Sequence, residues 1–152
     1  MTARSLTRPP VARAAHDLLG AARRELAAAA ATTVPTQRYA AAHLAALRSA
    51  AAVLAVRTRP ASARRRPRNV WVLLTEVAPE LGEWAAFFAA GATKRAAAEA
   101  GLTRAVTARE ADDLLRDAQT FLALVETTLL SHDRLYTHDR LYTHDRLPAR
   151  AS

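Results

Sequence analysis

The chain has 152 residues, a net charge of +8 and no cysteine. A chain of this length buries one substantial core, so a single domain is expected. The lack of cysteine excludes disulfides, thiolate catalysis and ordinary zinc ribbons, and it favours a reducing, cytoplasmic location. Abundant alanine, only four glycines and few aromatic or β-branched residues together predict an all-α fold.

Two helices are predicted in the first part of the chain, separated by a break at 32–35. Pro9 and Pro10 suit the start of the first helix, and a second begins near Thr36 and ends at 57–59. Apolar residues recur in the first helix at spacings of three and four: Val11, Ala15, Leu18, Ala22, Leu26 and Ala29. The apolar side of the second helix carries Tyr39, Leu44, Leu47, Ala51 and Leu54. Such a short connection favours antiparallel packing of the two helices.

No segment is predicted to be a secretory leader or to cross a membrane. The first apolar run is interrupted by charged residues from Arg13 onward. The longest weakly apolar stretch, Ala40 to Val56, contains His43 and Arg48. We therefore expect no membrane partner.

A basic segment follows the second helix and is the main chemical clue in the sequence. It contains six arginines within twelve residues: Arg57, Arg59, Arg64, Arg65, Arg66 and Arg68. Pro60 and Pro67 keep this segment out of any helix. Guanidinium groups bind phosphate and carboxylate through paired hydrogen bonds, so the segment predicts an anionic partner, either nucleic acid or another polyanion.

Further helices are predicted after the basic segment. Asn69 is a candidate N-cap, and Pro79 is expected to break the helix near Ala78 and to start a new one that ends by Gly101. The apolar positions of this region are Trp71, Leu74, Ala78, Leu81, Trp84 or Ala85, and Phe88. Residues 107–110 read Thr-Ala-Arg-Glu, a capping box that predicts the start of the last helix. Its core face carries Ala111, Leu114, Leu115, Ala118, Leu122, Val125 and Leu129.

A tandem repeat of six residues ends the chain. The sequence His-Asp-Arg-Leu-Tyr-Thr begins at His132, is repeated from His138 and is truncated at His144. On a helix, six residues advance by about 240° net, so the copies form no apolar stripe. The predicted organisation is a flexible arm at 1–9, a compact bundle of four or five helices at 10–131, and a disordered tail at 132–152. No rigid element brings the repeated histidines together, so neither a metal site nor a cofactor is predicted.

Arg38 and His43 form the one candidate catalytic pair, with R-x4-H spacing. An arginine can bind a phosphodiester while a histidine moves protons during RNA cleavage. On a helix the two residues lie about 140° apart, so they do not face the same cleft. Glu80 and Glu83 lie in a predicted first turn, where the helix dipole accounts for them without catalysis.

Four segments resemble an actinobacterial family of small HEPN-like helical proteins. They are RYAAAHLAALR (38–48), RPRNVWVLL (66–74), VAPELGEWAAFF (77–88) and READDLLR (109–116). The resemblance covers roughly residues 10–131. It implies a HEPN-superfamily bundle, whose members bind nucleotides or RNA, often dimerise, and in many cases cleave RNA in toxin or defence systems. Active members carry R-x4-6-H in a late helix, and this sequence has no such motif after Arg109 or Arg116.

These observations give three functional hypotheses. The leading one is a non-catalytic HEPN-like domain that binds nucleic acid or nucleotide through the basic segment. The second is a metal-independent ribonuclease that uses Arg38 and His43. The third is a protein-interaction module of antitoxin type. A homodimer is a further expectation, because a self-association face is predicted if Phe87 and Phe88 cannot both be buried.

Overall fold

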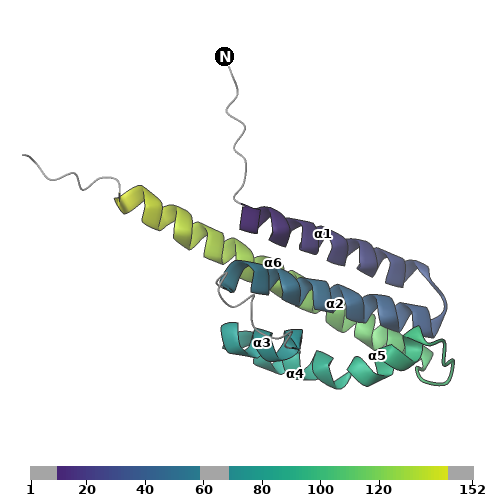
Figure 1. The fold of residues 1–152 in the computed structure, drawn as a ribbon. Coiled ribbons are helices and arrows are strands. Elements are labelled where there is room, and N and C mark those ends of the chain that lie inside the picture. Colours follow the sequence, from purple (N-terminus) through teal and green to yellow (C-terminus); the bar gives the residue numbers. More distant parts are fainter. Residues whose placement is uncertain (1–9, 59–68, 144–152) are drawn as a thin grey trace, which may run out of the picture.

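The computed structural model describes residues 10–58 and 69–143, and these form helices joined by short turns (Figure 1). The elements are α1 (Pro10–Ala31), α2 (Pro35–Arg57), α3 (Val70–Val77), the 3-10 turn η2 (Pro79–Leu81), α4 (Gly82–Ala90), α5 (Ala92–Glu99) and α6 (Ala108–Thr143). The predicted all-α bundle is confirmed. Three of its six α-helices are shorter than ten residues, which is why the described part holds more helices than the sequence predicted.

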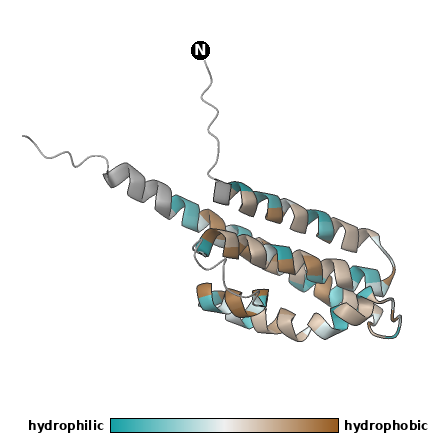
Figure 2. Cartoon of the chain, viewed as in Figure 1, coloured by the Kyte–Doolittle hydropathy of each residue, from teal (hydrophilic) through white to brown (hydrophobic). Residues whose placement is uncertain are grey.

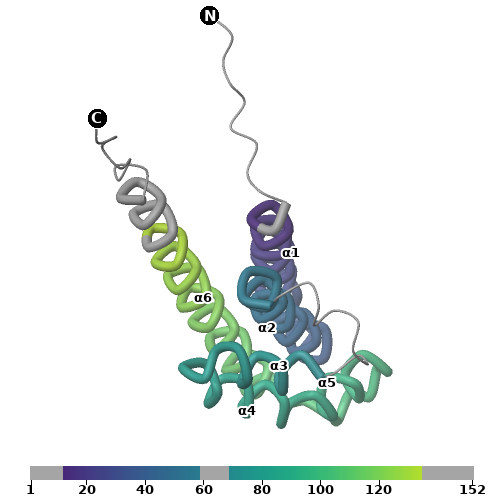
Figure 3. Tube along the Cα trace, turned by 60° about the vertical axis from the view of Figure 1, so that its left-hand side comes forward, coloured from purple at the N-terminus to yellow at the C-terminus, as the bar shows by residue number. Residues whose placement is uncertain are grey.

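Helix α2 is the central element of the bundle. It packs against α1, α6, α5 and α3, and α1 and α6 lie along it (Figure 1). Figure 2 shows apolar residues along much of its length, and Figure 3 shows α1 and α6 diverging toward one end of the bundle. By length and composition α2 could also cross a membrane, but half of its apolar window is buried inside the bundle, as a central core helix requires.

Alanine rather than leucine makes the closest contacts of α2. The fully buried alanines of this helix are Ala42, Ala45, Ala46, Ala50 and Ala52. The predicted leucines Leu44, Leu47 and Leu54 are only half-buried. Small side chains let neighbouring backbones approach, so the alanine face meets the other helices and the longer side chains fill the flanks.

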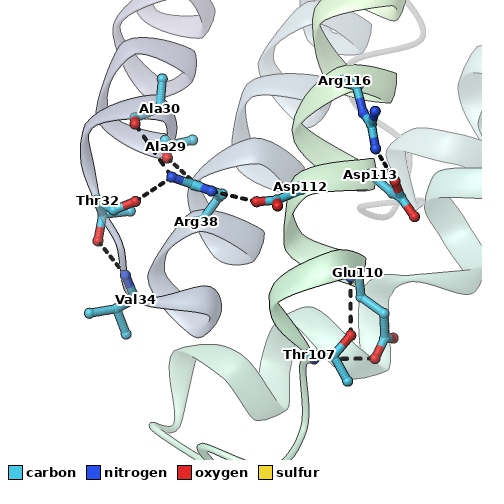
Figure 4. A network of polar contacts seen from close by, with 10 residues as sticks. All are labelled: Ala29, Ala30, Thr32, Val34, Arg38, Thr107, Glu110, Asp112, Asp113 and Arg116. Atoms are coloured by element: carbon cyan, nitrogen blue, oxygen red, sulfur yellow. Dashed lines mark hydrogen bonds and ion pairs between the residues drawn. The ribbon is translucent and has the colours of Figure 1, made fainter.

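The local signals that begin and end helices lie where the sequence predicted them. Asn69 caps α3 by accepting a hydrogen bond from the backbone N–H of Trp71 at 2.9 Å. The capping box of α6 is formed by two reciprocal hydrogen bonds between Thr107 and Glu110 (Figure 4). Helix α3 ends at Val77, two residues before Pro79, because proline disfavours helix at the residue before it.

An aromatic cluster fills the core between the short helices and α6. Phe88 and Phe121 are fully buried and their ring centroids lie 5.1 Å apart. Trp71 stacks on Phe88 at 5.3 Å, and Trp84 stacks on the same ring at 6.0 Å. Phe88 is therefore the centre of this cluster, and the predicted core positions from Trp71 to Phe88 are confirmed.

Two features differ from the predicted organisation. The helix expected from Pro79 to Gly101 is divided at Gly91 into α4 and α5. A Cβ atom at Gly91 would lie 2.9 Å from the hydroxyl oxygen of Tyr39, so the lack of a side chain permits this close approach. In addition, α6 continues to Thr143, whereas a disordered tail was predicted from residue 132. The rest of that predicted tail, 144–152, lies outside the described residues.

Candidate nucleic-acid interface

The basic segment connects the end of α2 to the start of α3. Arg57 is the one of its six arginines that falls within the described residues. The other five, Arg59, Arg64, Arg65, Arg66 and Arg68, lie outside them. The chain enters this segment from the last residue of α2 and leaves it at the N-cap residue Asn69.

Arg57 is already occupied by contacts within the protein. Its Nη1 atom pairs with the carboxylate of Glu80 and donates a 3.4 Å hydrogen bond to the carbonyl oxygen of Val77. The pKa of the Glu80 carboxyl is lowered, first by a hydrogen bond from its own backbone N–H and then by Arg57. Arg57 therefore joins the end of α2 to the α3–η2 turn, which makes it an anchor for the basic segment rather than a free phosphate ligand.

His43 is a fully buried core residue, not an exposed catalytic group. Its Nε2 atom donates a 2.8 Å hydrogen bond to the carbonyl oxygen of Phe88. That carbonyl lies in the last turn of α4, where it also accepts a 3.1 Å hydrogen bond from the backbone N–H of Gly91. The centroid of the imidazole ring lies 6.0 Å from those of Trp71 and Phe88, and its plane is nearly perpendicular to both rings. Burial lowers the pKa of His43, with a smaller contribution from the positive charge of Arg95, so the neutral imidazole is the form that the core accepts.

This buried imidazole predicts a loss of stability in acid. An unfolded histidine has a pKa of about 6.5 and takes up a proton before the folded one does. The contribution of His43 to the free energy of unfolding is therefore complete above that value and is lost as the pH falls toward the lowered folded pKa. Denaturant unfolding of the wild type and of His43→Gln across this range measures the effect, because glutamine can donate to the Phe88 carbonyl but does not titrate.

The difference between these two proteins isolates His43 from the carboxylates that titrate at lower pH. We expect the pH dependence of the free energy of unfolding to be shallower in His43→Gln than in the wild type. Equal slopes in the two proteins would contradict the assignment.

Arg38 lies in the first turn of α2 and joins three helices (Figure 4). Its guanidinium donates to the carbonyl oxygens of Ala29 at 3.0 Å, Thr32 at 2.7 Å and Ala30 at 3.5 Å. It also pairs with the carboxylate of Asp112 on α6. Carbonyls at the end of a helix have no partner inside it, so Arg38 caps the C-terminus of α1.

The structure does not bring Arg38 and His43 together at one site. Arg38 points to the end of α1 and to α6, and His43 points into the aromatic core below α4. Each side chain is committed to stabilising contacts, so the geometry gives no support to RNA cleavage by this pair. The R-x4-H spacing in the sequence could not show which contacts each of these two side chains makes.

The repeated histidines add no described site. The side chains of His138 and His144 lie outside the described residues. Elsewhere in the described ranges, no group of three or more histidine, aspartate or glutamate side chains is placed to hold a metal ion.

The comparisons with known proteins identify the class of this bundle. A family model for HEPN domains, described as SAV_6107-like HEPN, matches residues 27–126, which is 100 of the 152 residues. The matched region runs from α1 through the short helices into α6. The chain belongs to the SAV_6107-like HEPN family. No curated protein and no solved structure matches it.

Proposed function

We propose that this HEPN chain is a non-catalytic module that binds nucleic acid through its basic segment. The observation that carries the proposal is the density of arginine, six within the twelve residues from the last residue of α2 to the residue before the cap of α3. Arginine forks suit phosphate oxygens, and contacts of this kind read the backbone of a nucleic acid rather than its sequence.

The contacts of Arg57 refine the expected number of phosphate ligands. Because Arg57 is paired with Glu80, five arginines of the basic segment remain for an external anion. Five phosphate contacts give a log–log salt slope of about −3.5 for single strands and about −4.5 for duplex DNA. Arg57→Ala should therefore lower stability without changing that slope.

The absence of catalysis is supported by the positions of the two candidate residues. His43 is buried in the core and Arg38 caps α1, so neither is available to a substrate. The sequence also has no histidine four to six intervening residues after Arg109 or Arg116. RNA is expected to be recovered intact from the complex.

Binding of short single-stranded RNA and duplex DNA across a salt series tests this function. The variant replaces Arg59, Arg64, Arg65, Arg66 and Arg68 with alanine. The matched control replaces five exposed arginines elsewhere, Arg13, Arg24, Arg104, Arg109 and Arg134. Both variants lose the same net charge, so only a local phosphate-binding surface predicts loss of binding in the first and retention in the second.

Three results would overturn the proposal. A flat salt response would show that phosphate contacts do not drive binding. Equal loss in the two variants would reduce the effect to net charge. Failure of the wild type to bind at low salt would favour an acidic protein partner for the basic segment.

Homodimerisation and a cytoplasmic location remain predictions.

A further inference from the structure

An open hollow with a volume of about 360 Å³ lies where α4 meets α6. It is lined by Glu83, Trp84 and Phe87 of α4 and by Asp117 of α6. This volume is near the lower end for ligand sites, roughly 300–1,000 Å³, and suits a side chain or two rather than a whole helix. The sequence did not reveal it, because Asp117 comes from a different helix.

The aromatic walls of the hollow are held in place by the core. Trp84 stacks on the fully buried Phe88 and lies 5.7 Å from Phe121. Phe87 stands nearly perpendicular to Trp84, at 88°, and 46% of it is exposed. A large aromatic side chain in this position presents a rigid apolar surface at little cost in conformational entropy.

The two carboxylates of the hollow differ from most acids of the bundle. Glu80, Glu110, Asp112 and Glu126 each pair with an arginine or lysine. Neither Glu83 nor Asp117 has such a partner in the part of the chain that the structure describes. Burial raises the pKa of the Asp117 carboxyl and the negative charge of Asp113 adds to the rise, which the positive charge of Arg116 partly offsets. The hollow therefore combines aromatic rings with two acids that form no ion pair with an arginine or lysine of the described residues.

We propose that this hollow is a docking site for an arginine side chain on a basic segment of a partner protein. A guanidinium group can lie against an aromatic ring while its N–H groups bind carboxylates, and both kinds of surface are present here. Flanking apolar residues of the same segment would cover the exposed ring of Phe87. This proposal is independent of the nucleic-acid function of the basic segment.

Charge decides between this occupant and the alternatives. A two-fold symmetric dimer through this face would bring Glu83 and Asp117 of one copy toward the same acids of the other, and like charges oppose such a contact. An entirely apolar partner would bury both carboxylates without a partner, which is unfavourable. A cationic segment satisfies the acids and covers the rings together.

The capped peptide acetyl-Leu-Arg-Leu-amide is a direct probe of the site. Its matched control carries citrulline in place of arginine, which keeps the shape and removes the charge. The indole N–H resonance of Trp84, assigned by comparison with Trp84→Phe, reports occupancy by NMR. The variants are Glu83→Gln, Asp117→Asn and Phe87→Ala, with Asp17→Asn on the exposed side of α1 as the control.

We expect the arginine peptide to shift the Trp84 resonance saturably and the citrulline peptide to bind more weakly. Loss of either carboxylate should weaken binding by roughly two- to fivefold, as for exposed ion pairs, and Asp17→Asn should leave it unchanged. Equal binding of the two peptides would overturn the proposal, as would insensitivity to both acid substitutions or no saturable shift. Self-association of the wild type that is lost in Phe87→Ala would assign the face to a second copy instead.

Discussion

Replacing Phe88 with alanine should lower the free energy of unfolding by about 3–5 kcal/mol, the usual cost of truncating a buried phenylalanine. Phe88 has no exposed surface, and its ring lies against Trp71, Trp84 and Phe121. Its removal leaves a cavity where α2, α3, α4 and α6 meet, and the rigid rings around it cannot collapse to fill the space. Urea unfolding followed by far-ultraviolet circular dichroism measures the loss.

The neighbouring residue supplies the control for this prediction. Phe87 is also on α4, but 46% of it is exposed and its ring covers the surface side of the cluster. Phe87→Ala should cost less than about 1 kcal/mol, because surface truncations leave little cavity. Similar losses for the two variants would show that the cluster is not centred on Phe88.

Replacing Arg38 with alanine should cost about 2–3 kcal/mol, in the range for hydrogen bonds made by a charged group. The substitution leaves the carbonyls of Ala29, Ala30 and Thr32 without their donor at the end of α1. The ion pair with Asp112 contributes less, since half of that carboxylate side chain is exposed. Thermal or urea unfolding of the variant gives the value.

Two further variants separate the cap from the ion pair. Asp112→Asn should lose only a small part of what Arg38→Ala loses, since the carbonyl contacts remain. Arg38→Lys should fall between them, because one ammonium group cannot reproduce the spread of a guanidinium fork. If Asp112→Asn were as unstable as Arg38→Ala, the ion pair rather than the cap would be the main contribution.

These effects bear on any test for ribonuclease activity. A loss of RNA cleavage in Arg38→Ala or His43→Ala would have to exceed the loss of folded protein before it indicated catalysis. Measuring the folded fraction of each variant under assay conditions makes that distinction.

Local rules allowed much of the fold to be predicted from the sequence. Asn69, Pro79 and the Thr107–Glu110 box act on residues within one helical turn, so their effect can be recognised without knowing the tertiary structure. The buried stripe of the last helix was also predicted, because α6 presents one side to the bundle. For α2 the predicted face was right at Tyr39, which is buried, whereas its leucines are only half-buried. This helix has neighbours on several sides, and its alanines make the close contacts.

The candidate site was harder to predict because its residues are defined by partners far away in the sequence. From the sequence alone, His43 was a candidate catalytic residue, but its hydrogen bond to the carbonyl oxygen of Phe88 commits it to the core. Arg57 was a candidate phosphate ligand, but its side chain pairs with the carboxylate of Glu80. The close approach of the Tyr39 hydroxyl to Gly91 likewise joins residues far apart in the sequence, and no local pattern indicates it.

The hexapeptide repeat lies partly within the last helix, because α6 continues to Thr143. The residues of α6 that are buried in the core end at Val125, before the first copy of the repeat at His132. Gain or loss of one copy within the helix would change its length by about 9 Å and turn whatever follows by about 240°. Expansion of the repeat can therefore redirect the C-terminus of the protein in large steps while the folded bundle stays the same.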